Sequence, residues 1–218
     1  MPALLPPRRR ILDAARALFT AQGVTATGVD AISARAGVSK RTLYREFGSK
    51  EALTACYLRE FGDPGVLPAE DLLADAARPG RDRLLAAFAV LADDAARGGW
   101  RGCPATAAAV EIADAAHSAR TVAHEHKERF RGRVSAALRD AGVAEAAVGT
   151  LALRIAVLWD GALVQAVVQR TAAPVHEARA LVAELLDAAL PGLPGAAPRT
   201  DAGGPAGAAG RAVQPARG

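Results

Sequence analysis

Residues 37–53 read GVSKRTLYREFGSKEAL, and the spacing of glycine, capping and apolar residues in this stretch decides the fold of the N-terminal region. The glycine at its start permits the left-handed backbone of a tight corner, and Ser39 is a residue type that caps helices. The pattern predicts a short helix over 40–47. Gly48 and Ser49 then end that helix and begin another, predicted to run to about Phe61.

Two further helices are predicted before this stretch. Residues 8–22 repeat apolar side chains at helical spacing and are followed by a glycine. Residues 29–36 form a shorter segment, in which Thr27 and Asp30 are spaced as in a capping box. Only residues 37–39 separate the two short helices, which is the compact hinge of a helix-turn-helix.

The outward face of the second short helix carries positive charge. Successive side chains advance by about 100° around a helix, so four polar residues are predicted on one exposed arc, namely Lys40, Arg41, Tyr44 and Arg45. Leu43, with Val38 and Phe47, is left to anchor the helix to the core. In a major groove Arg or Lys reaches guanine O6 and N7, whereas Thr42 and Tyr44 are predicted to contact phosphates.

Other groups are expected to contact the DNA backbone. The helix starts near Thr27 and at Ser49 and Lys50 are predicted to bind phosphates, because unpaired backbone N–H groups and the positive dipole end favour anions. Residues 8–10 are three arginines, which we expect to form a flexible arm along the backbone or in a minor groove. For each single charge a solvated helix face is the alternative, but the whole set favours DNA binding.

Charge is divided unevenly along the chain. Residues 1–62 carry 10 Lys and Arg against 5 Asp and Glu, whereas the remaining 156 residues carry 17 against 18. All of the net positive charge therefore lies in the segment that contains the predicted helix-turn-helix. This asymmetry is expected when one part of a protein binds a polyanion and the rest does not.

Residues 9–58 closely resemble the DNA-binding domain of the TetR/AcrR family of transcriptional regulators, through the 37–53 string and through Thr27, Ile32 and Ala36 upstream. The resemblance implies an all-helical homodimer in which each N-terminal domain reads half of a near-palindromic operator in double-stranded DNA. A larger C-terminal domain would bind an unknown small-molecule effector, and repression is the family habit. The implied DNA contacts are Thr27, Lys40, Arg41, Thr42, Tyr44 and Lys50, to which the helix pattern adds Ser39 and Arg45. Gly28 and Glu46 depart from the commonest family pattern.

The fold class is predicted to be all-α, with about nine to ten helices. Beyond residue 62, apolar periodicity predicts helices over 69–77, 81–97, 104–115, 117–141, 144–171 and 175–190. We expect a three-helix helix-turn-helix domain within 1–62 and a ligand-binding and dimerisation domain over 66–190. Residues 191–218 are rich in Pro, Gly and Ala without an apolar face, and a disordered tail is predicted there.

The effector site is expected in the C-terminal domain. Candidate lining residues are Phe88, Trp100, Cys103, Glu111, His117 and Trp159. They would form a mostly apolar site with a few polar anchors, as small-molecule sites generally do, and ordinary core packing is the alternative reading.

One part of this set matches a motif. Residues 100–103 followed by Glu111 resemble a Gly-Cys motif of one large branch of the family, although Ala107 stands where that branch often has Asn. Cys103 is interpreted as a structural thiol ahead of a redox or electrophile sensor, since reactivity requires a lowered pKa and access, and sequence shows neither.

Two C-terminal helices are predicted to form the dimer interface. Their apolar stripes are Leu151, Ile155, Leu158, Ala162 and Ala166 on one helix and Ala178, Leu181, Val182, Leu185 and Ala189 on the other. Two such helices from each subunit would make a four-helix interface. Core packing within a monomer is the alternative, but a protein that reads two half-sites needs a partner.

The sequence predicts no catalytic residues, no metal site and no cofactor. His124 and His126 lie two residues apart and face different sides of a helix, and Cys56 and Cys103 lack the paired spacing of a zinc site or disulfide framework. A small helical enzyme or carrier is the rival class, but no nucleophile with a positioned base, acid pair or phosphate loop supports it.

No secretion signal is evident and the longest apolar stretch, 155–168, is short for a bilayer. A cytoplasmic protein without a membrane partner is therefore predicted.

Overall fold

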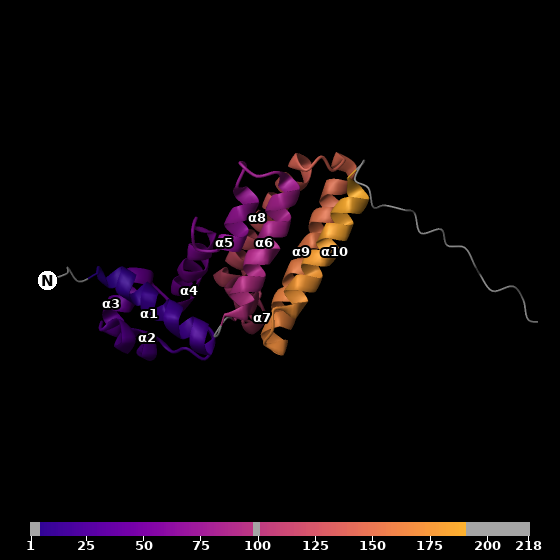
Figure 1. The fold of residues 1–218 in the computed structure, drawn as a ribbon. Coiled ribbons are helices and arrows are strands. Elements are labelled where there is room, and N and C mark those ends of the chain that lie inside the picture. The colour runs from indigo at the N-terminus through magenta and orange to yellow at the C-terminus, as the bar shows by residue number, and fades with distance from the viewer. Residues whose placement is uncertain (1–4, 98–100, 191–218) are drawn as a thin grey trace, which may run out of the picture.

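A computed structural model of the chain describes residues 5–97 and 101–190, and within these residues it contains ten α-helices and no strand (Figure 1). The helices are α1 Pro7–Gln22, α2 Val29–Ala36, α3 Lys40–Phe47, α4 Lys50–Arg59, α5 Pro68–Asp71, α6 Gly80–Ala96, α7 Pro104–Glu111, α8 Ser118–Asp140, α9 Glu145–Gln169 and α10 Ala173–Ala189. Short 3₁₀ turns follow α4, at Glu60–Gly62, and α5, at Leu72–Ala74. The all-α prediction is confirmed, while the predicted tail over 191–218 lies outside the described residues.

Two helices end at least three residues earlier than predicted, and a similar local interaction accompanies both ends. The helix predicted over 69–77 is reduced to α5 and its 3₁₀ turn, after which the Asp75 carboxylate accepts a hydrogen bond from the Ala77 N–H at 3.1 Å. The helix predicted over 104–115 ends at Glu111, and soon afterwards the Asp114 carboxylate accepts from the Ala116 N–H at 2.9 Å. Aspartate turns of this kind compete with helix propagation.

The N-terminal helices pack around a core that fixes the orientation of α3. Ile11 of α1, Ile32 of α2 and Leu43 of α3 are all fully buried in one hydrophobic cluster. Gly37, between α2 and α3, has φ 64° and ψ 40°, the left-handed conformation predicted for the corner. Ser39 accepts a hydrogen bond from the Thr42 N–H at 3.1 Å, so it caps α3 as predicted.

The predicted capping box at the start of α2 is wrong. Gly28 occupies the cap position, and α2 has no side-chain cap hydrogen bond. Thr27 is instead fully buried, and its hydroxyl donates to the Gly23 carbonyl oxygen at 2.6 Å. Thr27 therefore closes the turn between α1 and α2.

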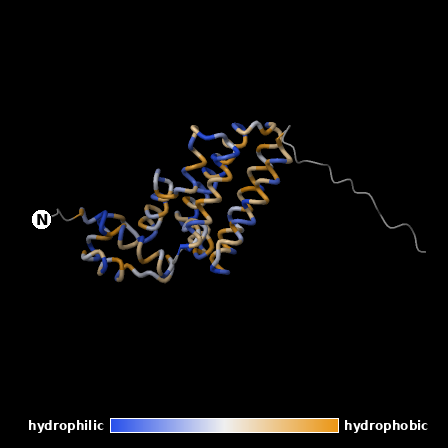
Figure 2. The backbone as a smooth tube through the Cα atoms, viewed as in Figure 1, coloured by the Kyte–Doolittle hydropathy of each residue, from blue (hydrophilic) through white to orange (hydrophobic). Residues whose placement is uncertain are grey.

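The C-terminal helices pack around a second core centred on Trp159 of α9. The Trp159 ring meets Phe88 of α6 and Phe130 of α8, each at a centroid distance of 4.9 Å. Helix α10 packs on both α6 and α9. Hydrophobic and hydrophilic residues alternate along these helices in Figure 2, as expected when one face of each helix is buried.

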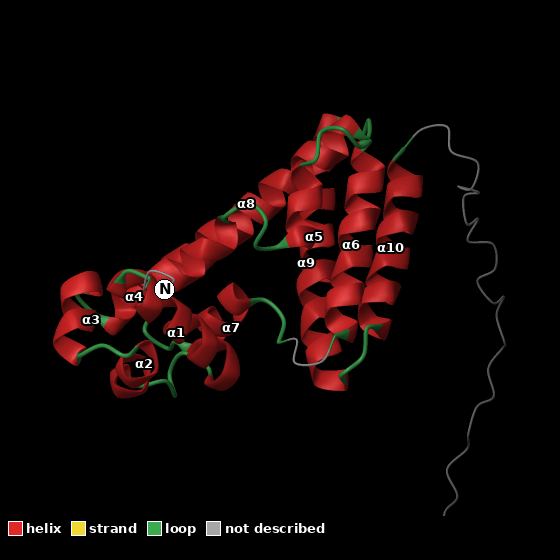
Figure 3. Cartoon of the chain, turned by 60° about the vertical axis from the view of Figure 1, so that its left-hand side comes forward, coloured by secondary structure: helices red, strands yellow, loops and turns green. Residues whose placement is uncertain are grey.

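Helices α7 and α8 join the two parts of the molecule. The long helix α8 extends from the N-terminal helices to the C-terminal helices in Figure 3. Ala108 of α7, Ile112 directly after that helix, and Ala119 and Val122 at the start of α8 are buried in the same cluster as the N-terminal core. The core beneath α3 is therefore completed by residues beyond the predicted boundary at 62–66, and that boundary remains a prediction.

Replacing Gly80 by alanine is expected to destabilise the fold. A Cβ at this first residue of α6 would overlap the Ala137 carbonyl oxygen and lie 2.8 Å from the Ala141 nitrogen, both backbone atoms at the end of α8. Because neither atom can move alone, we expect the free energy of unfolding to fall by about 1–3 kcal/mol in chemical denaturation. Gly132→Ala, within α8 where a Cβ meets nothing within 4 Å, is the matched control and should raise it by up to about 1 kcal/mol. Unchanged stability of Gly80→Ala would contradict the close α6–α8 contact.

Candidate nucleic-acid interface and effector sites

Helix α3 presents an exposed polar face. Leu43 and Phe47 are buried on its inner side, as the sequence pattern predicts. The side chains exposed on the other side are Ser39, Lys40, Arg41, Tyr44 and Arg45, and Thr42 is half-buried. Figure 1 places α3 among the N-terminal helices at the end of the molecule away from α9 and α10. Nothing in the described part of the protomer covers this face.

The cations on α3 differ in how free they are. Lys40 pairs with Asp30 of α2, and Arg45 pairs with Glu46 at 3.0 Å between Nη2 and Oε1. Within residues 5–97 and 101–190, Arg41 makes no ion pair. Arg41 is therefore the guanidinium most available to contact a base edge. Tyr44 is 45% exposed and lies one helical turn from Lys40.

The start of α4 lies next to the α1–α2 turn. Ser49 caps this helix by accepting from the Ala52 N–H at 2.9 Å. Lys50 Nζ lies 3.4 Å from the Thr25 carbonyl oxygen. Burial lowers the pKa of Lys50, and the Glu111 carboxylate opposes this shift. Lys50 is thus partly engaged within the protein, and Thr27, being buried, does not present its side chain to solvent.

The arm predicted for residues 8–10 is wrong, because all three arginines lie inside α1. Arg8 donates to the Glu46 carbonyl oxygen at 2.7 Å, and its guanidinium lies 4.3 Å from the Phe47 ring centroid. Arg10 donates to the Gly37 carbonyl oxygen at 2.7 Å. Arg8 therefore contacts the C-terminal end of α3, and Arg10 contacts the corner that precedes this helix. Helical periodicity could not predict these contacts, because each of them bridges more than 25 residues.

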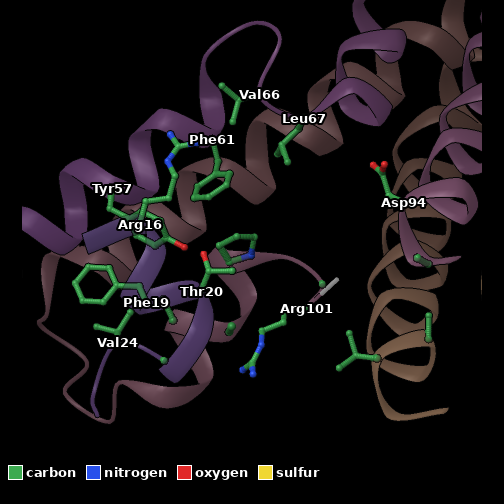
Figure 4. Close-up of a pocket in the computed structure, with 18 of the residues that line it drawn as sticks. Arg16, Phe19, Thr20, Val24, Tyr57, Phe61, Val66, Leu67, Asp94 and Arg101 are labelled. Atoms are coloured by element: carbon green, nitrogen blue, oxygen red, sulfur yellow. The ribbon is translucent and has the colours of Figure 1, made fainter. Parts of the chain in front are cut away.

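A large cleft of about 1080 Å³ separates the N-terminal helices from the C-terminal helices (Figure 4). Its aromatic wall consists of Phe19 of α1, Tyr57 of α4 and Phe61, whose rings stack edge to face in sequence. Four arginines also line it, namely Arg16, Arg97, Arg101 and Arg170. Glu111 is the one predicted ligand residue, among those that the structure describes, that lines this cleft.

Glu111 joins the C-terminal part of the chain to the α1–α2 turn. Its carboxylate accepts hydrogen bonds from the backbone N–H groups of Val24, at 3.0 Å, and of Thr25. Burial raises the pKa of Glu111, but these two N–H groups and Lys50 outweigh it and hold the pKa below its usual value. The residue predicted as a ligand anchor is thus a contact between the two parts of the molecule.

Glu111→Gln is expected to loosen this contact, because the amide replaces one acceptor oxygen with a donor facing a backbone N–H. Loss of a charge-assisted hydrogen bond at this exposed site should speed amide exchange at Val24 and Thr25 about fivefold. Since the folded-state pKa is depressed, the contact is complete at neutral pH. The ratio of the native to the intrinsic exchange rate at residues 24 and 25 should therefore rise as pH falls through that pKa. Glu125→Gln, an exposed change on α8, is the control. Exchange at residues 24 and 25 that does not respond would refute the contact.

The remaining predicted ligand residues do not share one site. Cys103 and Trp159 line a small cavity of about 60 Å³ in the C-terminal part, and Phe88 packs behind Trp159. His117 precedes α8, and its Nδ1 accepts from the Ala119 N–H at 3.1 Å, which is a capping role. Trp100 lies outside the described residues.

The fold and the α3 face together define a helix-turn-helix DNA-binding protein with an attached helical domain. Residues 11–55 match the family described as bacterial regulatory proteins, tetR family, and residues 81–181 match the LmrA/YxaF-like transcriptional regulator C-terminal domain. A TetR transcriptional regulator from Streptomyces avermitilis superposes with a TM-score of 0.75 and 33% identity, over 84% of this chain and 98% of that one. A TetR-family regulator from Streptomyces coelicolor superposes with a TM-score of 0.74 and 25% identity, over 84% and 95%. This chain belongs to the TetR family of transcriptional regulators.

Curated relatives match only the DNA-binding region. An HTH-type transcriptional regulator from Mycobacterium tuberculosis is 49% identical over 49 residues, which is 22% of this chain and 24% of that protein. The chain thus matches about a quarter of the length of this relative. The likeness supports the helix-turn-helix and carries no information on the effector.

Proposed function

We propose that this TetR-family protein binds double-stranded operator DNA as a homodimer and represses transcription until a small molecule binds in its C-terminal half. The exposed face of α3 carries the proposal, because a short helix anchored by Leu43 and Phe47 leaves Arg41 and Tyr44 free for a major groove. Such a repressor would act in the cytoplasm.

The homodimer is supported by an apolar stripe on α9. Leu153, Val157, Val164 and Val168 are exposed, and with Gly161 they share one face of the helix. The sequence pattern predicted a different face of α9 as the dimer interface. That prediction is wrong, because Leu151, Ile155, Ala162 and Ala166 on that face are buried within the protomer. Exposed apolar residues in a row are characteristic of an interaction surface, and Leu181 is also exposed on the neighbouring helix α10.

The same helix is long and apolar enough, by composition, to cross a membrane, and 39% of the relevant stretch is buried in the protomer. Core helices of water-soluble proteins meet the same criterion. A second copy of α9 and α10 against the stripe would cover its exposed part in a four-helix interface. We therefore assign the hydrophobicity of α9 to the core on one side and to a dimer interface on the other.

Effector response is supported by the position of the large cleft. A ligand between the aromatic wall and the C-terminal helices would contact both parts of the molecule and change their separation. The contacts that now hold the two parts together include the Glu111 hydrogen bonds and the packing of α4 against α8. To shift the population almost completely from one state to the other, the ligand must prefer one state by about 5.5 kcal/mol. An aromatic cleft with several arginines has the chemistry to supply such a preference.

The test is selection of DNA by the purified full-length protein from a pool of random duplexes, followed by affinity measurements at several salt concentrations. We expect enrichment of a near-palindromic sequence and an affinity that falls steeply with salt, because several phosphates are contacted. Enrichment of no sequence, with binding absent even at low salt, would refute the proposed function.

A further inference from the structure

The Cys103 thiol lies in a cluster of charged groups that DNA binding does not use. Its Sγ is 3.9 Å from His126 Nε2 and 3.8 Å from Lys127 Nζ, both on α8. Cys103 is also the cap residue of α7, so its sulfur stands at the positive end of that helix. The groups nearest to the sulfur are therefore positively charged or can become so.

Carboxylates from neighbouring helices hold the two basic residues in place. Glu70 of α5 lies 3.1 Å from His126 Nε2, and Asp160 of α9 pairs with Lys127. Arg133 lies 3.8 Å from Glu70, and Asp94 of α6 lines the cavity beside the thiol. His126 and Glu70 are almost fully buried, so their orientation is set by the fold.

These neighbours change the acidity of the thiol. Burial raises the pKa of Cys103, but the hydrogen bond with His126, the charge of Lys127 and the Thr106 backbone N–H lower it to about 7. Burial likewise lowers the pKa of His126, but Cys103 and Glu70 raise it to about 9. Near neutral pH a large fraction of Cys103 is therefore thiolate beside an imidazolium, and the thiolate is the nucleophilic form of cysteine.

The sulfur is also within reach of small molecules. Cys103 is half-buried and lines the cavity of about 60 Å³ together with Trp159 and Leu163. This cavity and the large cleft share four lining residues, which are Leu67, Asp94, Gly102 and Pro104. A molecule that enters the cleft therefore has a short path to the sulfur.

We propose that Cys103 is a covalent receptor site for small α,β-unsaturated carbonyl compounds. The thiolate attacks the β-carbon, a sulfur–carbon bond forms, and the carbon–carbon π bond breaks as its electrons move to the α-carbon. The imidazolium of His126 or a water molecule then supplies the proton that the α-carbon takes up. The addition needs no oxidant or reductant, and Lys127 is a positioning residue that favours the thiolate.

An adduct on Cys103 would also weaken DNA binding, an effect that rests on the proposed function. The cavity is too small for an adduct of more than a few heavy atoms, so its walls, including the start of α7, must move. The other end of α7 carries Glu111, which holds the backbone of Val24 and Thr25. Alkylation of Cys103 should therefore loosen the α1–α2 turn and release the operator.

The test uses acrylamide as the electrophile, the full-length protein, and mass spectrometry of the two cysteine-containing peptides. Cys56, also half-buried, is the internal control. Relative to an ordinary thiol of pKa 9.0, a pKa of about 7 raises the thiolate fraction at pH 7 about 50-fold, while intrinsic reactivity falls about eightfold. We expect Cys103 to react about sixfold faster than such a thiol at pH 7. The pH at which its alkylation rate is half-maximal should lie near 7. Lys127→Met should raise this pH, and Lys127→Arg should restore it.

Alkylation of Cys103 no faster than Cys56, or a midpoint near pH 9 that Lys127→Met leaves unchanged, would overturn the receptor site. Alkylated protein should bind the selected duplex at least tenfold more weakly, and Cys103→Ser treated identically should keep its affinity. Full affinity after complete alkylation would overturn the regulatory consequence. Failure of untreated protein to bind any duplex would refute the proposed function instead, because the alkylation rates do not depend on DNA.

Discussion

The double variant Arg41→Ala/Tyr44→Ala is expected to bind the selected operator at least about thirtyfold more weakly than the unmodified protein. Each base contact that is lost costs about 1–3 kcal/mol, and a symmetric dimer loses it twice, so the cost is at least about 2 kcal/mol. Both side chains are exposed on α3, and the buried anchors Leu43 and Phe47 are unchanged. The variant should therefore fold normally by circular dichroism and fail only in a fluorescence anisotropy titration with DNA.

Arg131→Ala is the charge-matched control. Arg131 is exposed on α8 and pairs with Glu128 at 2.6 Å, so its replacement removes one positive charge per protomer without touching α3. Its affinity should stay within about twofold of the unmodified protein at 0.15 M salt, where distant charges are screened. Equal losses in both proteins would mean that the helix-turn-helix attracts DNA by net charge alone.

Val157→Glu is expected to separate the dimer. Val157 is 64% exposed in the protomer, near the middle of the α9 stripe, and the two-fold symmetry of a dimer would bring two copies of the carboxylate into one apolar interface. Burying unpaired charges costs several kcal/mol, so sedimentation velocity at micromolar concentration should show monomers. Operator affinity should fall by about 10²-fold or more, because linked half-sites no longer bind together.

Val110→Glu is the matched control for this substitution. Val110 is 81% exposed, but it stands on α7, outside the apolar stripe. It should leave the sedimentation coefficient unchanged. A Val157→Glu protein that remains dimeric would place the interface elsewhere on the molecule.

The sequence predicted those features that depend on local chemistry. The glycine corner at Gly37 and the Ser39 cap follow from conformational preferences of single residues, and the division of α3 into a buried and an exposed side follows from helical periodicity. The same information placed nearly every helix within a few residues. It failed at Thr27, because a threonine before a helix is an equally good candidate for a cap and for a buried turn residue.

Features that depend on distant residues could not be predicted. Residues 8–10 look like a flexible arm until the carbonyl acceptors of Arg8 and Arg10 and the aromatic partner of Arg8, 27 to 39 residues away, are placed beside them. The cluster around Cys103 draws on Glu70, His126 and Asp160, which no sequence spacing connects. The α9 stripe was assigned to the wrong face because that helix is apolar on two sides, and periodicity alone does not tell which side the protomer buries.

Dimethyl sulfate protection of the selected operator tests the reading of DNA by α3 most directly, since the reagent methylates guanine N7 in the major groove and adenine N3 in the minor groove. We predict two groups of protected guanines on one face of the duplex, about 10 base pairs apart between centres, and loss of that protection in Arg41→Ala. Bound DNA in which guanine N7 stays fully reactive, or in which only adenine N3 is protected, would contradict a major-groove role for this helix.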